Sequence, residues 1–118
     1  MRGIAGLALF LTFTAQAADK SLPDPSTGLE KAATSGKRTA VFAGGCFWCT
    51  EAVFEELAGV DKVVSGYAGG TAQTAKYDVV SAGKTDHAEV IEITYDPSKM
   101  AFGHLLKVFF AAAHDPTQ

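Results

Sequence analysis

Hydrophobic and polar residues follow two periods along this chain, and these periods predict its strands and helices. Between residues 87 and 95 every second residue falls on the same side, which is the period of a strand. A shorter apolar run at 39–43 and a run at 62–67 predict two further strands. One side of the 87–95 strand carries Glu89, Ile91, Ile93 and Tyr95, and the other carries Ala88, Val90, Glu92 and Thr94.

Two other stretches have apolar residues at the spacing of an α-helix. The first begins near residue 46 and ends before Gly59, which suits the end of a helix. The second ends at His114, because Pro116 disfavours helix in the residue before it. Between the strands at 62–67 and 87–95, residues 71–86 are predicted to form a loop with one helical turn at 77–80. The apolar faces are Phe47, Thr50, Val53, Phe54 and Leu57 in the first helix and Phe102, Leu105, Leu106, Phe109 and Ala113 in the second.

The predicted order is β-α-β-β-α, which indicates an α+β fold. Helices on one face of a small, mostly antiparallel sheet would give a two-layer sandwich. A ferredoxin-like plan has one more strand after the second helix, and the sequence stops before it. We therefore expect a ferredoxin-like sandwich with its last strand missing.

The N-terminus has the pattern of a signal peptide over residues 1–17. Arg2 supplies a positive start, residues 4–13 are apolar, and Ala15-Gln16-Ala17 matches a cleavage site, although a buried N-terminal helix is the alternative. Residues 18–37 are turn-rich and predict a flexible leader before a domain at 38–118. The mature protein is expected to be exported, periplasmic or secreted, in an oxidising compartment.

Composition limits the class of partner. The chain has 118 residues, of which 47% are hydrophobic, and its net charge is -3 without a run of Lys or Arg. We therefore expect no nucleic-acid partner. No cysteine lies near the predicted cleavage site, so we expect no lipid anchor and no membrane attachment after cleavage, and a monomer.

Both cysteines lie in the segment Gly44-Gly45-Cys46-Phe47-Trp48-Cys49. This segment is predicted to run from strand through a glycine turn into a helix, which puts Cys46 at the helix N-terminus. Unpaired N–H groups and the helix dipole there favour a thiolate nucleophile. Cys49 lies one turn further, at a separation compatible with a disulfide. Because so short a loop would stabilise the fold little, reversible redox use is favoured over a structural disulfide, while two buried cysteines remain the alternative.

Other residues could assist such a nucleophile. Phe47 and Trp48 point about 100° apart on a helix, so at least one should line the surface beside Cys46. Glu89 shares a strand face with isoleucines, an environment that favours a protonated carboxyl and hence a proton donor, although a solvated glutamate is the alternative. Tyr67 and Tyr77 are either hydroxyl donors or packing residues. His87, His104 and His114 show no metal-binding spacing, and one CxxC pair leaves a tetrahedral zinc site incomplete.

Together these residues resemble the A-type peptide methionine sulfoxide reductases. The matching stretches keep the family order from about residue 38 to the end. They are Gly45-Cys46-Phe47-Trp48, Gly66-Tyr67-Ala68-Gly69-Gly70, Tyr77, Ser81-Ala82-Gly83-Lys84-Thr85, His87-Ala88-Glu89-Val90, Tyr95-Asp96-Pro97 and His114-Asp115-Pro116-Thr117.

The resemblance implies reduction of methionine (S)-sulfoxide, free or in proteins, with no metal or organic cofactor. It implies that Cys46 attacks the sulfoxide sulfur and becomes a sulfenic acid. Phe47 and Trp48 would hold the S-methyl group, Glu89 would protonate the departing oxygen, and Tyr77 would assist it. A second thiol must then clear the sulfenic acid. Cys49 is the only other thiol of this chain, so this step would use Cys49 or an external reductant such as thioredoxin.

The sequence departs from the family in several places. Thr74-Ala75-Lys76 and Asp86 are expected to be loop variation, and two other departures bear on activity. Many relatives have Gly at the position of Cys49 and carry recycling cysteines near the C-terminus. Relatives also continue past His-Asp-Pro-Thr into a stretch that supplies another Asp and Tyr and a further strand. We therefore expect an incomplete copy, and an inactive fragment is one alternative function. A soft-metal carrier and a thioredoxin-type dithiol oxidoreductase are the others, although Phe47 and Trp48 between the thiols do not suit a metal carrier.

Overall fold

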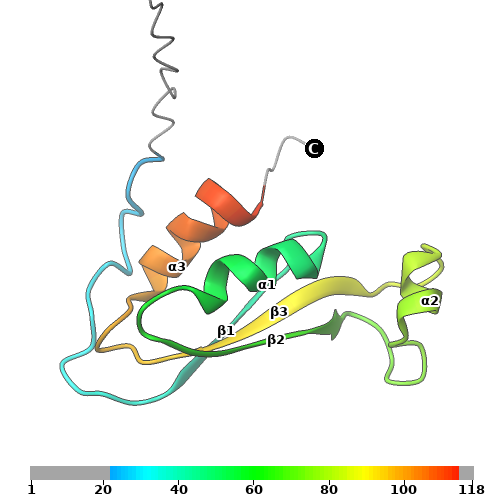
Figure 1. The fold of residues 1–118 in the computed structure, drawn as a ribbon, viewed down its shortest axis with the longest axis horizontal. Helices are drawn as coiled ribbons and strands as arrows, with labels where there is room; N and C mark the ends of the chain where they lie inside the picture. Colours follow the sequence, from blue (N-terminus) through cyan, green and yellow to red (C-terminus); the bar gives the residue numbers. More distant parts are fainter. Residues whose placement is uncertain (1–21, 115–118) are drawn as a thin grey trace, which may run out of the picture.

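The computed structural model describes residues 22–114 (Figure 1). The predicted signal peptide at 1–17 and residues 115–118 lie outside this range. No helix in the described range is long and apolar enough to span a membrane. The elements are β1 (Arg38–Phe42), α1 (Phe47–Glu55), β2 (Val60–Ala68), α2 (Tyr77–Ser81), β3 (Ala88–Tyr95), α3 (Phe102–Val108) and the π-helix η1 (Phe109–Ala113).

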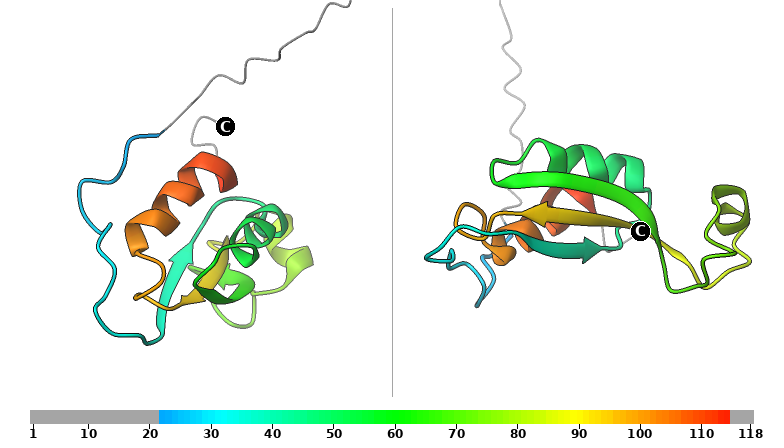
Figure 2. Two further views of the ribbon diagram at one scale, coloured as in Figure 1. Left: turned by 60° about the vertical axis from the view of Figure 1, so that its left-hand side comes forward. Right: turned by 90° about the horizontal axis from the view of Figure 1, so that it is seen from below.

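The described strands form one antiparallel sheet in the order β1-β3-β2. Helices α1 and α3 lie together over one face of this sheet, while α2 stands apart at one end (Figures 1 and 2). The alternation predicted for β3 decides which face is covered: Ile91, Ile93 and Tyr95 are buried, and Glu92 on the other side is exposed. The predicted α+β two-layer fold is confirmed.

Aromatic rings join the two helices to the sheet. The ring of Phe42 in β1 lies 5.7 Å from that of Phe54 in α1 and 4.9 Å from that of Phe109 in η1, centroid to centroid. Burying a side chain of this size stabilises a fold by about 1.5–3 kcal/mol. The buried core comprises Ala40, Phe42, Phe47, Phe54, Val63, Ile91, Ile93, Tyr95, Leu105 and Phe109.

The first helix is shorter than predicted. It ends at Glu55, whereas the apolar pattern extended it through Leu57 to Gly59. Strand β2 begins at Val60, which pairs with Tyr95 in β3, so the chain must leave the helix early enough to reverse. Gly59 makes this reversal at a φ of +94°, a conformation that favours glycine, and its carbonyl accepts a hydrogen bond from the N–H of Asp96 at 2.9 Å.

The second predicted helix has the expected extent but changes form at Phe109. Its last turn is a π-helix, in which the N–H of His114 donates to the carbonyl of Phe109 at 2.8 Å. Leu105 and Phe109 face the core, as the pattern predicted. Phe102 is 46% exposed, because it lies at the rim of the core, where its ring centroid is 6.0 Å from that of Phe42.

The segment at 22–37 forms no helix or strand, and it contacts the domain beside α3. The carbonyl of Gly28 accepts a hydrogen bond from the N–H of Gly103 at 2.7 Å, and Ala32 donates to the carbonyl of Pro97 at 2.8 Å. A Cβ at Gly103 would lie 2.7 Å from the Gly28 oxygen, so this approach requires glycine. Contacts of the domain thus extend N-terminally of residue 38, while the predicted flexibility of the leader stays a prediction.

Candidate active site

Cys46 is the N-cap residue of α1, directly before the first helical turn. Gly45 precedes it at a φ of +82°, so the strand-glycine-helix path predicted from the sequence is the one observed. The carbonyl of Cys46 accepts hydrogen bonds from the hydroxyl and the N–H of Thr50, at 3.1 and 3.4 Å. Because its backbone is fixed in this way and its side chain is exposed, the Cys46 thiol is held at the surface.

Gly44 allows this turn to approach the π-helix η1. A Cβ at Gly44 would lie 2.9 Å from the ring of Phe109 and 3.3 Å from the Thr50 hydroxyl. Real Cβ atoms almost never come this close to a buried ring, so a larger residue would move the turn. The glycine pair therefore sets both the direction of the chain before Cys46 and the packing of that turn on η1.

Cys49 is also exposed, and both cysteines are free thiols. Cys46 raises the pKa of Cys49 above its usual 9.0, first through a hydrogen bond between the two side chains and then through its charge. The two side chains therefore influence each other, and Cys49 gives up its proton less readily than an isolated cysteine would. This arrangement suits an attacking thiolate paired with a second thiol that reacts later.

Glu89 meets the first turn of α1. Its Oε2 accepts a hydrogen bond from the N–H of Phe47 at 3.2 Å, across 42 residues of sequence. The side chain is half-buried and shares the core face of β3 with Ile91 and Ile93, as the alternation predicted. The carboxyl group therefore lies beside the residue that directly follows Cys46, at the N-terminal end of the helix.

Phe47 and Trp48 diverge, as their positions on the helix predicted. Phe47 is 9% exposed, and its ring centroid lies 5.7 Å from that of Tyr67. Trp48 is 71% exposed. An apolar group at Cys46 would thus meet one aromatic side chain fixed in the core and one that is open to solvent.

The structure gives different environments to Tyr67 and Tyr77, whose roles as hydroxyl donors or packing residues the sequence did not decide. Tyr67 in β2 pairs with Glu89 in β3, and burial, followed by the charge of Glu89, raises the pKa of Tyr67 above its usual 10.0. Tyr77 is the first residue of α2 and is 60% exposed. Its hydroxyl and Asp78 add smaller effects in the same direction on the pKa of Tyr67, so α2 lies within electrostatic reach of the site.

Two contacts near the site were missed by sequence reasoning. His87, interpreted from its spacing as no metal ligand, packs with its ring centroid 6.0 Å from that of Tyr67. Its position two residues before Glu89 on the same side of the strand was the available signal. The Ser65 hydroxyl donates to Glu51, which ties β2 to α1, and no local pattern indicates that contact.

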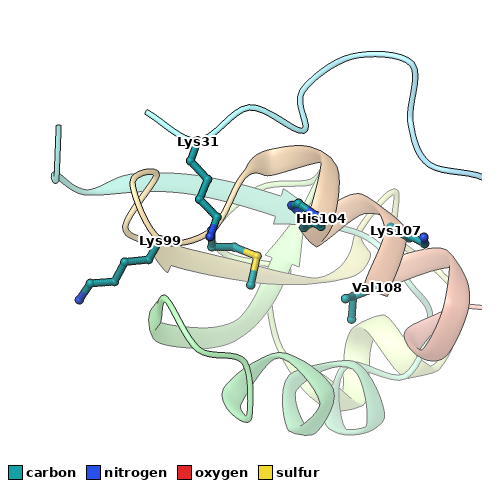
Figure 3. A pocket seen from close by; sticks show the side chains of 6 residues that line it. Lys31, Lys99, His104, Lys107 and Val108 are labelled. Atoms are coloured by element: carbon teal, nitrogen blue, oxygen red, sulfur yellow. The ribbon is translucent and has the colours of Figure 1, made fainter. Parts of the chain in front are cut away.

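No three His, Cys, Asp or Glu side chains within residues 22–114 gather into a set that could hold a metal ion. A separate pocket of about 280 Å³ lies between the 22–37 segment and α3 (Figure 3). Lys31, Lys99, His104 and Lys107 line it together with Met100 and Val108. Its residues come from other elements than those that hold Cys46 and Glu89.

Comparisons with known proteins assign the chain to a family. The family model described as peptide methionine sulfoxide reductase matches residues 38–118, more than half of the chain. The protein named peptide methionine sulfoxide reductase MsrA 2 from Synechocystis sp. is 52% identical over 116 residues, which cover 96% of this chain and 54% of that relative.

Two further relatives agree. MsrA 2 from Mesorhizobium japonicum is 53% identical over 90 residues, 76% of this chain and 46% of that protein. MsrA from Haloquadratum walsbyi is 60% identical over 80 residues, 68% of this chain and 45% of that protein. The chain thus spans about half the length of these relatives. The match to the family model and these identities show that this chain belongs to the peptide methionine sulfoxide reductase family, A type.

Proposed function

We propose that this protein reduces methionine (S)-sulfoxide, free or within proteins, to methionine, and so acts in protein repair. The observation that carries the proposal is the hydrogen bond from Phe47 N–H to the Glu89 carboxyl, beside the exposed Cys46 thiol. It supports a nucleophile and a proton donor at one helix terminus. Membership of the family supports the choice of substrate.

The first step transfers oxygen from the substrate to Cys46. The Cys46 thiolate attacks the sulfoxide sulfur and forms an S–S bond while the oxygen takes up a proton. The protonated oxygen then passes to the Cys46 sulfur, and both the S–O bond and the S–S bond to the substrate break. A sulfoxide oxygen leaves poorly as an anion, so a neutral carboxyl group at Glu89 is the proton donor that this step needs. The substrate sulfur gains two electrons and becomes a thioether, while Cys46 is oxidised to a sulfenic acid.

Cys49 resolves the sulfenic acid. Its sulfur attacks the Cys46 sulfur, a disulfide forms, and the oxygen leaves as water. The raised pKa of Cys49 supports this order, because it favours the thiol form of Cys49 before the sulfenic acid is present. An external dithiol protein of the thioredoxin type then reduces the disulfide, and neither a metal nor an organic cofactor takes part.

Phe47 and Trp48 form the site for the S-methyl group, and Tyr77 assists protonation of the oxygen. The open position of Trp48 supports access by a sulfoxide on the surface of a protein. The enzyme acts as a monomer after export to the periplasm or the medium. The pattern of residues 1–17 supports that export.

The test is the variant Cys46→Ser. We expect it to release no methionine from methionine sulfoxide with dithiothreitol as reductant, because a serine hydroxyl is far less nucleophilic than a thiolate at neutral pH. Chromatographic measurement of methionine in the full chain provides the readout. The matched control is Cys49→Ser, which should still release one equivalent per enzyme. Turnover by Cys46→Ser would overturn the proposal.

A further inference from the structure

The imidazole of His87 makes several hydrogen bonds to the loop between β2 and α2, in addition to those that the Thr71 and Thr74 hydroxyls make within the loop. Nδ1 of His87 accepts a hydrogen bond from the N–H of Gly70 at 3.2 Å. Nε2 lies 3.0 Å from the carbonyl oxygen of Thr71 and 3.1 Å from the hydroxyl of Thr74. Three residues of the loop thus meet the two nitrogens of a single imidazole.

These contacts determine where the imidazole carries its proton. The Gly70 N–H can only donate, so Nδ1 must be an acceptor, and the Thr71 carbonyl can only accept, so Nε2 must carry the proton. In the Nδ1–H tautomer, the Nδ1 proton would face the N–H of Gly70, so that two donors meet. The unprotonated Nε2 would face the Thr71 carbonyl, so that two acceptors meet. A doubly protonated ring would lose the Gly70 contact. Both contacts therefore favour the same species, the neutral ring with its proton on Nε2.

The two glycines of the loop allow the ring to lie against the backbone. A Cβ at Gly70 would fall on the imidazole, 2.6 Å from Cδ2 of His87. A Cβ at Gly69 would lie 2.6 Å from the carbonyl oxygen of Asp86, and Gly69 has a φ of +104°. The Gly69-Gly70 pair therefore packs closely against Asp86 and His87, and a side chain at either glycine would clash with them.

A series of backbone hydrogen bonds links the part of the loop that contacts His87 to α2, which begins at Tyr77. The N–H of Thr74 donates to the carbonyl of Thr71 at 3.1 Å, and that of Lys76 donates to the carbonyl of Thr74 at 2.9 Å. The carbonyl of Lys76 then accepts from Val80 at 2.9 Å in the first turn of α2. Helix α2 has no buried residue of its own, so core packing does not hold it and these backbone links help to place it.

We propose that neutral His87 is a positioning residue, which holds loop 69–76 and thereby keeps Tyr77 near Tyr67, the residue that pairs with Glu89. The proposal rests on the proposed sulfoxide reduction. His87 contacts neither the Cys46 thiol nor the Glu89 carboxyl in the hydrogen bonds of the site. It acts through Tyr77 and through the Tyr67 ring, against which its own ring packs.

Activity measurements compare His87→Ala with two conservative variants. We expect His87→Ala to slow single-turnover release of methionine by about 10- to 100-fold, since small misplacements of a reacting group have effects of this size. The substrate concentration at half-saturation should change only a few-fold. His87→Asn keeps an acceptor for Gly70 and His87→Gln keeps a donor for Thr71, so each should restore part of the rate. Equal rates in wild type and His87→Ala would overturn the proposal.

A double-mutant cycle tests whether the effect passes through Tyr77. In a Tyr77→Phe background, His87→Ala should cause much less than its single-variant loss, because the hydroxyl that it positions is already absent. Additive losses would overturn this route. Gly70→Ala should reproduce the loss by displacing the imidazole. Gly66→Ala is its matched control, because a Cβ there meets nothing within 4 Å.

Two measurements are independent of activity. The nitrogen NMR spectrum of His87 in the full chain should show the neutral Nε2–H tautomer at pH 7, and either other form would overturn the proposal. Amide hydrogen exchange over residues 70–80 should accelerate in His87→Ala and Gly70→Ala but not in Gly66→Ala. If the wild type releases no methionine, the proposed function fails, and the exchange and NMR results still decide whether His87 holds the loop.

Discussion

The two oxygens of the Glu89 carboxyl have different environments. Oε2 accepts the hydrogen bond from the N–H of Phe47 at 3.2 Å. Because the Phe47 N–H contacts Oε2, Oε1 is the oxygen that the proposed acid would present to a substrate. The helix N-terminus therefore orients the proposed acid and helps to define which of its oxygens donates.

Glu89→Gln tests the proton donor. The amide keeps the shape and can accept the Phe47 hydrogen bond, but it cannot transfer a proton. A general acid contributes about 100- to 10,000-fold to a rate, so we expect single-turnover methionine release to fall within that range. Substrate affinity should change little, because the proposed site for the methyl group consists of Phe47 and Trp48. A rate within a few-fold of wild type would mean that the proton comes from another group, Tyr77 first.

Cys49→Ser tests recycling. We expect the variant to release one equivalent of methionine and then to stall with thioredoxin as reductant, because no neighbouring thiol remains to form the disulfide. Mass spectrometry after one turnover should find the wild type two hydrogens lighter, with a bond between Cys46 and Cys49. A persistent sulfenic acid on Cys46 of the wild type would contradict the resolving role.

At the scale of elements, the turn between β3 and α3 depends on Asp96. Its Oδ1 accepts hydrogen bonds from the N–H of Ser98 at 2.9 Å and from the Ser98 hydroxyl at 2.7 Å. These bonds, the hydroxyl first, hold the pKa of Asp96 below its usual 3.8, with smaller effects from the backbone of Gly36 and the charge of Lys99. Asp96 is only 8% exposed, so its charged form depends on these partners.

Asp96→Asn should remove a pH-dependent part of the stability. Because the folded pKa is depressed, the carboxylate stabilises the fold above its usual pKa of 3.8, and this contribution is lost as the pH falls through the folded value. Thermal unfolding from pH 7 to pH 2.5 should show a wild-type advantage that shrinks in acid. Ser98→Ala should show the same trend with smaller amplitude. An advantage that is independent of pH would contradict the role of the charge.

At the scale of the whole molecule, one small core joins both helices to the sheet. Phe54 of α1 and Leu105 of α3 have no exposed surface, and both pack over the β3 face that carries Ile93. The domain also uses the 22–37 segment, whose Asp24 forms an ion pair with Lys107 at 2.7 Å. That pair is exposed to solvent and contributes little, so the core dominates stability.

Phe54→Ala should therefore remove a large part of the free energy of unfolding. Truncation of a buried Phe typically costs about 3–5 kcal/mol, and a small domain has about 5–15 kcal/mol in total. Urea unfolding followed by circular dichroism provides the measurement. The matched control is Val64→Ala on the opposite face of β2, where the side chain is 41% exposed, and we expect a small change. Equal losses in both variants would contradict the assigned core.

The sequence by itself determined which residues share a face and where the site lies along the chain. The period of two in β3 put Glu89 with Ile91 and Ile93, and that face is buried. The glycine turn put Cys46 at the N-terminus of a helix. Both are local properties, because a strand alternates and a helix exposes its first N–H groups whatever else surrounds it.

Only the tertiary structure decided which distant residues meet. The register of β2 on β3 placed Tyr67 opposite Glu89 and ended α1 at Glu55. The contacts of His87 with the 70–74 loop depend on the same register. Pairing between segments far apart in sequence depends on the packing of the whole sheet, and no local period encodes it. The sequence thus predicted a nucleophile at Cys46 and a proton donor at Glu89, and the fold determined which distant residues surround them.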